Sequence, residues 1–311
     1  MRVSLLIRSL PEIVRKQGLR VFIENVLIHL RSEIGDRLRM LLLRIRHDYY
    51  LSNRVERRRN RIMLNIARKS TLSPRNGDPL VSVLIPTYNR GRVLVERAVA
   101  SVLKQTYQNF EIVIVGDHCT DNTEQLIKDL DDERIRFCNL PAKTKYPESP
   151  RDRWMVAGVG PRNEALKLCS GDWIAPLDDD DEFSHDHIEV LLNYALEHDC
   201  EMVYGKVMFE NRPNEWIELG SYPLACGGLC HISVLYTSRL RFLEYDINSW
   251  KYGEPTDWNM WRRMKEAGVR IGFVNRVVGK YYLEGVRKAA LEKNLHVRYW
   301  CNLSRCFVIS E

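Results

Sequence analysis

Four consecutive aspartates, Asp178 to Asp181, are the residues best suited to chemistry in this chain of 311 residues. Carboxylates this close repel one another, so a folded protein tolerates them where a cation or solvent relieves their charge. A hard divalent ion accepts such oxygen ligands and also bridges the oxygens of a diphosphate. In an extended segment Asp178 and Asp180 share one face, so the run predicts a Mn²⁺ or Mg²⁺ site. The alternative is a solvated acidic turn.

The elements around the run indicate where it lies in the fold. Residues 173–177 read as a buried strand, which delivers Asp178 at its carboxyl end, where open α/β sheets bind ligands. Upstream, strands and helices alternate from residue 80, an order that predicts a parallel sheet with helices on both faces. Downstream, a helix near 188–196 and further strands indicate a more mixed half of the domain.

The upstream elements follow from periodicity. Apolar β-rich runs predict strands at 81–85, 110–115 and 135–138, and one apolar face predicts a helix at 95–102. Asp121 and Glu124 have the spacing of a capping box that opens another helix. Pro161 is expected at the start of a short helix that Gly171 ends.

Five short blocks, in order along the chain, resemble the family 2 glycosyltransferases, which have the GT-A fold. The blocks are residues 81–89, 105–112, 115–121, 162–165 and 177–181. The resemblance extends over residues 80 to about 283. It implies an α/β domain with a Rossmann-like, mostly parallel sheet flanked by helices.

The resemblance also implies a donor site. Its nucleotide-binding residues would be Pro86, Thr87, Tyr88, Asp117, Asn163, Asp178 and Asp179. Asp117 would accept a hydrogen bond from the base, which suits the imide of uracil, although a carboxylate just past a strand end also forms turns. Asp180 is the expected metal ligand, together with Asp178. Asp179 and Asp181 are expected to support the ligands or to cap a helix.

A candidate catalytic base lies further along the chain. Residues 253–261 resemble the acidic motif in which an aspartate of the family deprotonates the acceptor, and Asp257 aligns with that base. Two alternatives stay open: Asp257 is the N-cap of the helix that carries Trp258 and Trp261, or Glu254 is the base.

These residues predict an inverting, metal-dependent transfer of a sugar from a nucleotide diphosphate sugar, in particular a UDP-sugar, to an acceptor hydroxyl. The products expected are cell-surface glycans or glycolipids. The alternative is a degenerate relative that binds nucleotide sugar without turnover, which departures from the family pattern at Gly116, His118 and Thr256 would suit. A nucleotidyltransferase is disfavoured, because no glycine-rich basic loop follows the first strand.

The first 70 residues form a basic segment, with 17 of the 47 Lys and Arg but only 6 of the 41 Asp and Glu. An apolar stripe at helical spacing predicts an amphipathic arm that either lies on a membrane surface or packs on the domain or a second copy of the chain. No recognition motif accompanies the arginines, so nucleic acid is not an expected partner. A glycan or lipid-linked acceptor fits the arm better.

The predicted organisation has four parts. They are a helical arm at 1–70, a linker at 71–79, a GT-A domain at 80–284 and a C-terminal helical segment at 285–311. The domain divides into a nucleotide-binding half, 80–181, and an acceptor half, 182–284. No apolar stretch is long enough to span a membrane, so the expected location is the cytoplasm, on the cytoplasmic face of a membrane. The eight scattered cysteines are expected to be reduced thiols.

Overall fold

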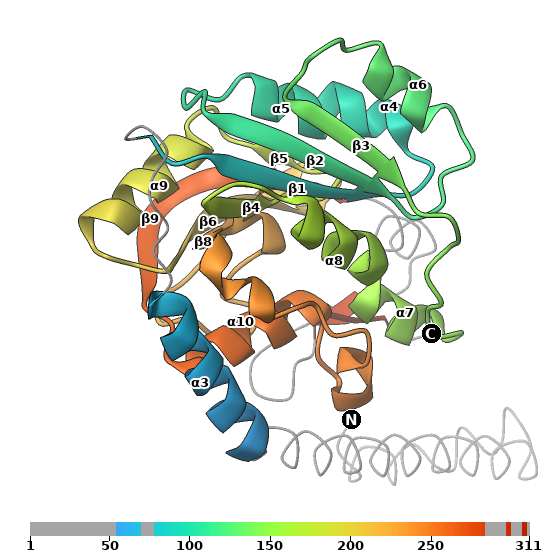
Figure 1. Ribbon diagram of the computed structural model, residues 1–311. Helices are drawn as coiled ribbons and strands as arrows, with labels where there is room; N and C mark the ends of the chain where they lie inside the picture. The colour runs from blue at the N-terminus through green and yellow to red at the C-terminus, as the bar shows by residue number, and fades with distance from the viewer. Residues whose placement is uncertain (1–53, 70–77, 284–296, 300–306, 310–311) are drawn as a thin grey trace, which may run out of the picture. The chain divides into compact units, whose positions relative to one another are not determined.

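A mixed sheet of nine strands, in the order β3-β2-β1-β4-β8-β6-β9-β5 with β7 paired to β6, forms the centre of the fold (Figure 1). The computed structural model describes residues 54–69, 78–283, 297–299 and 307–309. The strands of this sheet are β1 Val81–Thr87, β2 Phe110–Gly116, β3 Ile135–Asn139, β4 Trp173–Pro176, β5 Glu182–Phe183, β6 Met202–Arg212, β7 Glu215–Leu219, β8 Val234–Thr237 and β9 Ile271–Tyr281.

Helices cover both faces of the sheet. Figure 1 shows α5 and α6 on one side of β1 to β3 and α8 on the other. The helices of the domain are α4 Gly91–Val93, the π-helical turn Leu94–Val99, α5 Ala100–Leu103, α6 Thr123–Lys128, α7 Pro150–Val156, α8 Val159–Leu168, α9 His187–Glu197 and α10 Thr256–Ala267. Short 3₁₀ turns lie at His231–Ser233, Ser238–Phe242 and Ser249–Tyr252.

The first half of the sheet is parallel, as the alternation of elements predicts. β1 pairs in parallel with β2 and β4, and β2 pairs with β3. Every residue of β1 and β2 is buried, because each strand contributes to the core on both faces: Val83 and Ile85 pack in one hydrophobic cluster and Leu84 in the other. Parallel strands end at the same edge, so the residues that follow β1, β2 and β4 are brought together there.

The second half of the sheet is mixed. β8 joins the two halves by antiparallel pairing with β4 and β6, and β6 then pairs in parallel with β9. The sequence did not predict β8 or β9. β8 continues the sheet next to β4, and β9 continues it next to β6, so the acceptor half and the nucleotide-binding half share one sheet rather than forming separate lobes.

Local details differ from the predicted boundaries. α8 begins at Val159, two residues before Pro161, and ends at Leu168. Gly171 is therefore not the helix stop: a Cβ there would lie 2.6 Å from Ser82 Oγ and 2.7 Å from the Leu80 carbonyl oxygen, so glycine permits close contact with β1. The N-cap of α6 is Asn122 rather than Asp121.

The described part of the basic arm is one helix, α3 Arg54–Lys69. It belongs to the same compact unit as the sheet, and Arg68 forms a bidentate ion pair with Glu201, at 2.7 Å for both hydrogen bonds. This helix thus packs on the domain, and the rest of the arm and most of the linker lie outside the described residues. Within the described ranges, no helix combines the length and the apolar character needed to cross a membrane.

Two expectations for the C-terminal half need correction. The six described residues of 285–311 are not helical but form two short antiparallel strands, β10 Val297–Tyr299 and β11 Phe307–Ile309. Cys226 is disulfide-bonded, so the expectation of reduced thiols is wrong for this residue. It is confirmed for Cys119, Cys138, Cys169, Cys200 and Cys230.

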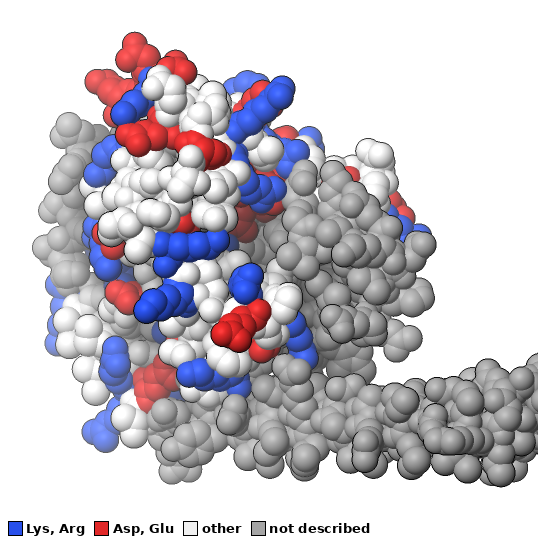
Figure 2. All heavy atoms as spheres, turned by 90° about the vertical axis from the view of Figure 1, so that its right-hand side faces the viewer, with Lys and Arg blue, Asp and Glu red and all other residues white. Residues whose placement is uncertain are grey.

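Charged side chains of both signs are interspersed on the face drawn in Figure 2. Acidic side chains gather at the top of this view, at the height of α6 in Figure 1. A face on which both signs of charge alternate is typical of a solvated surface and does not by itself indicate a ligand.

Candidate active site

A cavity of about 610 Å³ opens between α8, α10 and the ends of β4, β6 and β7. Three charged side chains from distant parts of the sequence line it: Arg162 of α8, Asp178 after β4 and Asp257 of α10. Aromatic and apolar residues form much of the remaining wall, among them Trp154, Phe209, Ile217, Leu229, Trp258, Trp261 and Tyr281. A few convergent charges in a largely apolar hollow are typical of a ligand site.

Arg162 holds the centre of this cavity. Its Nη2 donates to Asp178 Oδ1 at 2.7 Å, and its Nη1 donates to the Ala157 carbonyl oxygen at 2.7 Å. Burial opposes the charge of both partners, but the ion pair outweighs it, so the pKa of Arg162 is raised and the pKa of Asp178 is lowered. Arg162 Nε is buried without a hydrogen-bond partner among the described residues, which leaves a donor for a bound ligand.

Asp257 lies in the first turn of α10. The N-cap residue is Pro255, so the alternative in which Asp257 is the N-cap is wrong. The Trp258 backbone N–H donates to Asp257 Oδ1 at 2.7 Å. Burial raises the pKa of Asp257 above its ordinary value, although this N–H and Arg162 partly oppose the rise. The structure therefore brings together a carboxylate of raised pKa, a buried cation and the first aspartate of the run.

Glu254 does not reach this cavity. It is fully buried, and its carboxylate accepts hydrogen bonds from Asn259 Nδ2 at 2.8 Å and from Arg262 Nε and Nη2 at 2.8 and 3.0 Å. A carboxylate fixed inside an ion pair supports the start of α10 and is not free to accept a proton from a substrate. The alternative with Glu254 as base is therefore wrong.

The other aspartates of the run point to different partners. Arg90 Nη1 lies 2.8 Å from Asp180 Oδ2 and 3.2 Å from Asp179 Oδ1. Asp181 Oδ1 accepts the Tyr282 backbone N–H at 2.9 Å, so Asp181 anchors the chain after β9 rather than capping α9. Its Oδ2 is buried with no hydrogen-bond partner among the described residues.

The run as a whole is short of positive charge. Burial and the neighbouring carboxylates raise the pKa of Asp179 to about 7 and the pKa of Asp181 well above its ordinary value. The pKa of Asp180 is also raised, chiefly by burial. Oxygen donors that repel one another fit a hard divalent cation.

The number of available ligands limits how such an ion is held. In the described part of the chain no three acidic, histidine or cysteine side chains converge to hold a metal. An ion at Asp180 and Asp178 would thus take most of its ligands from phosphate oxygens and water. This is the usual coordination of Mg²⁺ at nucleotide sites.

The predicted nucleoside residues lie where the parallel strands end. Thr87 Oγ1 donates to Asp179 Oδ2 at 2.7 Å, which links the end of β1 to the aspartate run. Asp117, after β2, is buried and accepts hydrogen bonds from Thr144 N, Thr144 Oγ1 and the Tyr146 hydroxyl at 2.9, 2.7 and 2.7 Å. Only one of these bonds reaches Oδ2, and a carboxylate oxygen accepts two, so Asp117 retains capacity for a base N–H.

The remaining predicted residues have other surroundings. Pro86 is buried in β1. Tyr88 is 42% exposed, and Lys143 Nζ lies 3.6 Å from the centre of its ring. Asn163 Nδ2 and Oδ1 both bond the Tyr245 backbone at 2.9 Å, so this amide fixes the segment that leads to α10.

His231 is a cavity residue that the sequence analysis did not identify. It is 4% exposed, and neither ring nitrogen has a hydrogen-bond partner among the described residues. Its Nε2 lies 4.0 Å from Asp178 Oδ1. Burial and Arg162 lower its pKa to about 3, so the ring is neutral and offers one donor and one acceptor to a ligand. The aspartate run did not indicate it, because His231 lies 53 positions after Asp178 in the sequence.

Known proteins resemble this chain over the same region. Residues 82–263 match the family described as glycosyl transferase family 2. The UDP-Glc:alpha-D-GlcNAc-diphosphoundecaprenol beta-1,3-glucosyltransferase WfgD of Escherichia coli is 32% identical over 41% of this chain and 46% of its own length. The GalNAc(5)-diNAcBac-PP-undecaprenol beta-1,3-glucosyltransferase of Campylobacter jejuni is 31% identical over 44% of this chain and 40% of its own. The chain thus matches less than half the length of each relative.

Solved structures share the fold. TarS 1-349 of S. aureus in complex with UDP-GlcNAc superposes with a TM-score of 0.54 at 18% identity, covering 68% of this chain and 60% of TarS 1-349. The mannosyltransferase PcManGT of Pyrobaculum calidifontis, in complex with GDP-Man and Mn²⁺, has a TM-score of 0.50 at 13% identity, covering 82% of this chain and 70% of its own. At this level of identity the likeness concerns the arrangement of strands and helices alone.

Proposed function

Because the chain belongs to glycosyl transferase family 2, we propose that it transfers a sugar from a nucleotide diphosphate sugar to an acceptor hydroxyl. The convergence of Arg162, Asp178 and Asp257 on one cavity carries this proposal. The donor proposed is a UDP-sugar, since WfgD is named for UDP-Glc and TarS is a UDP-GlcNAc complex.

Asp257 is the proposed general base. Its carboxylate removes the proton from the acceptor hydroxyl as that oxygen attacks the anomeric carbon, and the bond between this carbon and the diphosphate oxygen breaks with its electron pair on the diphosphate. A single displacement of this kind inverts the anomeric configuration. The raised pKa of Asp257 suits this role, because a more basic carboxylate accepts a proton more readily.

Arg162 and the aspartate run would stabilise the negative charge that develops on the leaving diphosphate. A buried guanidinium with an unpartnered Nε can donate to the leaving diphosphate, and burial strengthens that interaction. A divalent cation, Mn²⁺ or Mg²⁺, held by Asp180 and Asp178, would neutralise the diphosphate. Arg90, which now pairs with Asp179 and Asp180, would adjust its position as the ion binds.

The nucleoside end of the donor is assigned to the strand ends. Asp117 would accept the imide N–H of the base through its remaining acceptor capacity, with Pro86, Thr87 and Tyr88 beside the nucleoside. Asn163 and Asp179 would act through the segments they hold, the Tyr245 backbone and Thr87 respectively.

The acceptor proposed is a lipid-linked glycan precursor at the cytoplasmic face of a membrane. Two relatives named for diphosphoundecaprenol or PP-undecaprenol substrates support this class. The apolar wall of the cavity is compatible with the faces of sugar rings, which stack on side chains such as Trp154 and Trp258.

A second candidate is a protein that binds nucleotide sugar without turnover. It is favoured by the internal pairing of the acidic residues, since Asp117 is already bound by Thr144 and Tyr146. The two candidates differ in transfer, not in donor binding.

Thermal stabilisation by nucleotide diphosphates, with and without Mn²⁺, tests the donor site first. We expect UDP to stabilise the wild type only with Mn²⁺, and Asp180→Asn to lose this effect. Stabilisation without transfer from any UDP-sugar would select the second candidate. If no nucleotide stabilises the wild type, both candidates fail.

A further inference from the structure

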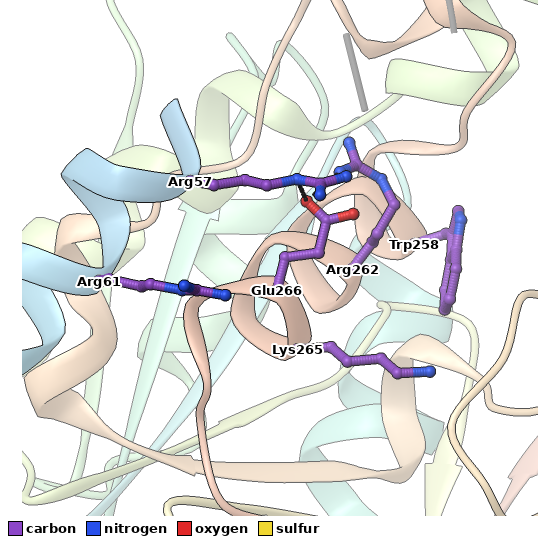
Figure 3. A pocket seen from close by; sticks show the side chains of 6 residues that line it. All are labelled: Arg57, Arg61, Trp258, Arg262, Lys265 and Glu266. Carbon is purple, nitrogen blue, oxygen red and sulfur yellow. Dashed lines mark hydrogen bonds and ion pairs between the residues drawn. The ribbon is translucent and has the colours of Figure 1, made fainter. Parts of the chain in front are cut away.

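A second hollow of about 400 Å³ lies between α3 and α10 (Figure 3). Arg57 and Arg61 reach into it from α3, and the other lining residues, from α10, are Trp258, Arg262, Lys265 and Glu266. Trp258, Arg262 and Lys265 recur at four- and three-residue spacing, so they lie on one face of α10. We call this hollow the α3–α10 pocket.

The pocket carries excess positive charge. The one carboxylate among its described lining residues, Glu266, lies 3.2 Å from Arg57 Nε and 3.1 Å from Arg262 Nη1, as Figure 3 shows for Arg57. Arg262 is in addition paired with buried Glu254, outside the pocket. These two carboxylates balance two of the four cations.

The cations left over are Lys265 and Arg61. Lys265 Nζ donates to the Leu224 carbonyl oxygen at 2.8 Å, a neutral partner. Arg61 is exposed and makes no ion pair or hydrogen bond with the described residues. Two cations of one pocket that have no acidic partner among the described residues favour a phosphate-bearing ligand.

The pocket adjoins the candidate active site. Trp258 lines both hollows, so its side chain belongs to the wall of each. Asp257 and Lys265 lie on the same helix, about 12 Å apart along its axis at roughly 1.5 Å per residue. A sugar in the cavity and a phosphate in the pocket can therefore belong to one short molecule.

The outer face of α3 indicates the side from which a lipid would approach. Val55, Ile62, Met63 and Ile66 are 77%, 50%, 36% and 58% exposed, and their spacing puts them on the side of α3 opposite Leu64, which is buried. Arginines flank this apolar stripe. A basic helix of this pattern suits the surface of an anionic membrane.

We propose that the α3–α10 pocket binds the phosphate groups of a lipid-linked acceptor while its sugar enters the cavity beside Asp257. The inference rests on the proposed function for the identity of the acceptor. The lipid chain then stays on the side of α3 that carries the apolar stripe. The pocket thus selects acceptors that carry a phosphate over neutral glycosides.

Calorimetry with geranyl diphosphate, and with geraniol as the neutral probe, tests the pocket on the full chain. UDP and Mn²⁺ are present to occupy the donor site. Arg61→Glu reverses one pocket charge, and Arg61→Ala removes it. Arg59→Glu is the matched control, because Arg59 is an exposed arginine of the same helix that does not line the pocket.

We expect geranyl diphosphate to bind the wild type and the control equally, and Arg61→Glu to weaken binding by about tenfold or more. Geraniol binding should be the same for the wild type and all variants. Equal binding by all variants, or no binding by the wild type, would overturn the proposal. The proposal would also be overturned if Arg61→Glu weakened binding to phosphatidylglycerol vesicles but left binding of geranyl diphosphate unchanged, because the ligand would then be a membrane headgroup.

The calorimetry needs no turnover, which separates the two proposals. A wild type that binds geranyl diphosphate but transfers no sugar contradicts the proposed function and leaves the pocket as a phosphate site. If the wild type transfers sugar but Arg61→Glu and Arg59→Glu bind geranyl diphosphate equally well, the proposal for the pocket is contradicted and the proposed function is not.

Discussion

Replacing Asp179 with asparagine should stabilise the folded protein at neutral and alkaline pH. Asp179 is 7% exposed and lies in a run of carboxylates, and burial together with Asp180 raises its pKa from 3.8 to about 7. Between these pH values the folded protein binds more protons than the unfolded chain. The free energy of unfolding therefore falls as the pH rises through this window.

The size of the effect follows from the same two pKa values. The difference between 3.8 and about 7 corresponds to about 4 kcal/mol of unfolding free energy, lost by the wild type once the pH exceeds the folded pKa. Asparagine carries no charge and keeps an oxygen that can accept the hydrogen bond from the Thr87 hydroxyl. Asp179→Asn should thus be more stable than the wild type by as much as about 4 kcal/mol above pH 7 and by nearly nothing below pH 4.

Urea unfolding between pH 4 and pH 8 measures this difference directly. Asp131→Asn is the matched control, because Asp131 is an exposed aspartate remote from the run, and its stability should follow the wild type. Mn²⁺ with UDP should reduce the difference in unfolding free energy between Asp179→Asn and the wild type, since a bound cation relieves the repulsion between carboxylates in the wild type. A variant no more stable than wild type at pH 8, or equally stabilised at pH 4, would refute the electrostatic reasoning.

Three further predictions concern the cavity. Asp257→Asn should lower kcat by about 10²- to 10⁴-fold while UDP with Mn²⁺ still stabilises the protein, and unchanged transfer in steady-state assays would exclude Asp257 as the base. In the wild type the acidic limb of the kcat/KM profile should lie above pH 3.8, because burial raises the pKa of the base. His231 should remain neutral at pH 5, because its pKa is lowered to about 3; a charged imidazole in its ¹⁵N spectrum at that pH would contradict this environment.

The donor side of the fold was predictable because its signals are local. β1 and β2 are short apolar runs buried on both faces, and the run at Asp178 follows a strand that parallel pairing brings beside Thr87 and Asp117. Each inference needed only residues a few positions apart, plus the rule that parallel strands end at one edge.

The second half of the domain was less predictable. β8 and β9 enter the sheet beside strands far away in sequence, and no periodicity encodes which neighbour a strand takes. Whether Asp257 or Glu254 faces the cavity was also undetermined, since both are acidic residues near the start of one helix. The ion pair of Glu254 with Arg262, eight positions later, buries that carboxylate and leaves Asp257 at the cavity.

The sequence by itself determined the chemistry available to this protein: carboxylates for a cation, an aspartate after a strand and a basic amphipathic helix. Tertiary structure decided which of these groups act together. Arg162, Asp178 and Asp257 meet because α8, β4 and α10 pack around one cavity, and Arg61 and Lys265 line one pocket because α3 contacts α10. The physical reason is that these effects act over different distances along the sequence. Helix propensity and hydrophobic periodicity depend on residues a few positions apart, whereas burial and ion pairing select partners across the whole chain.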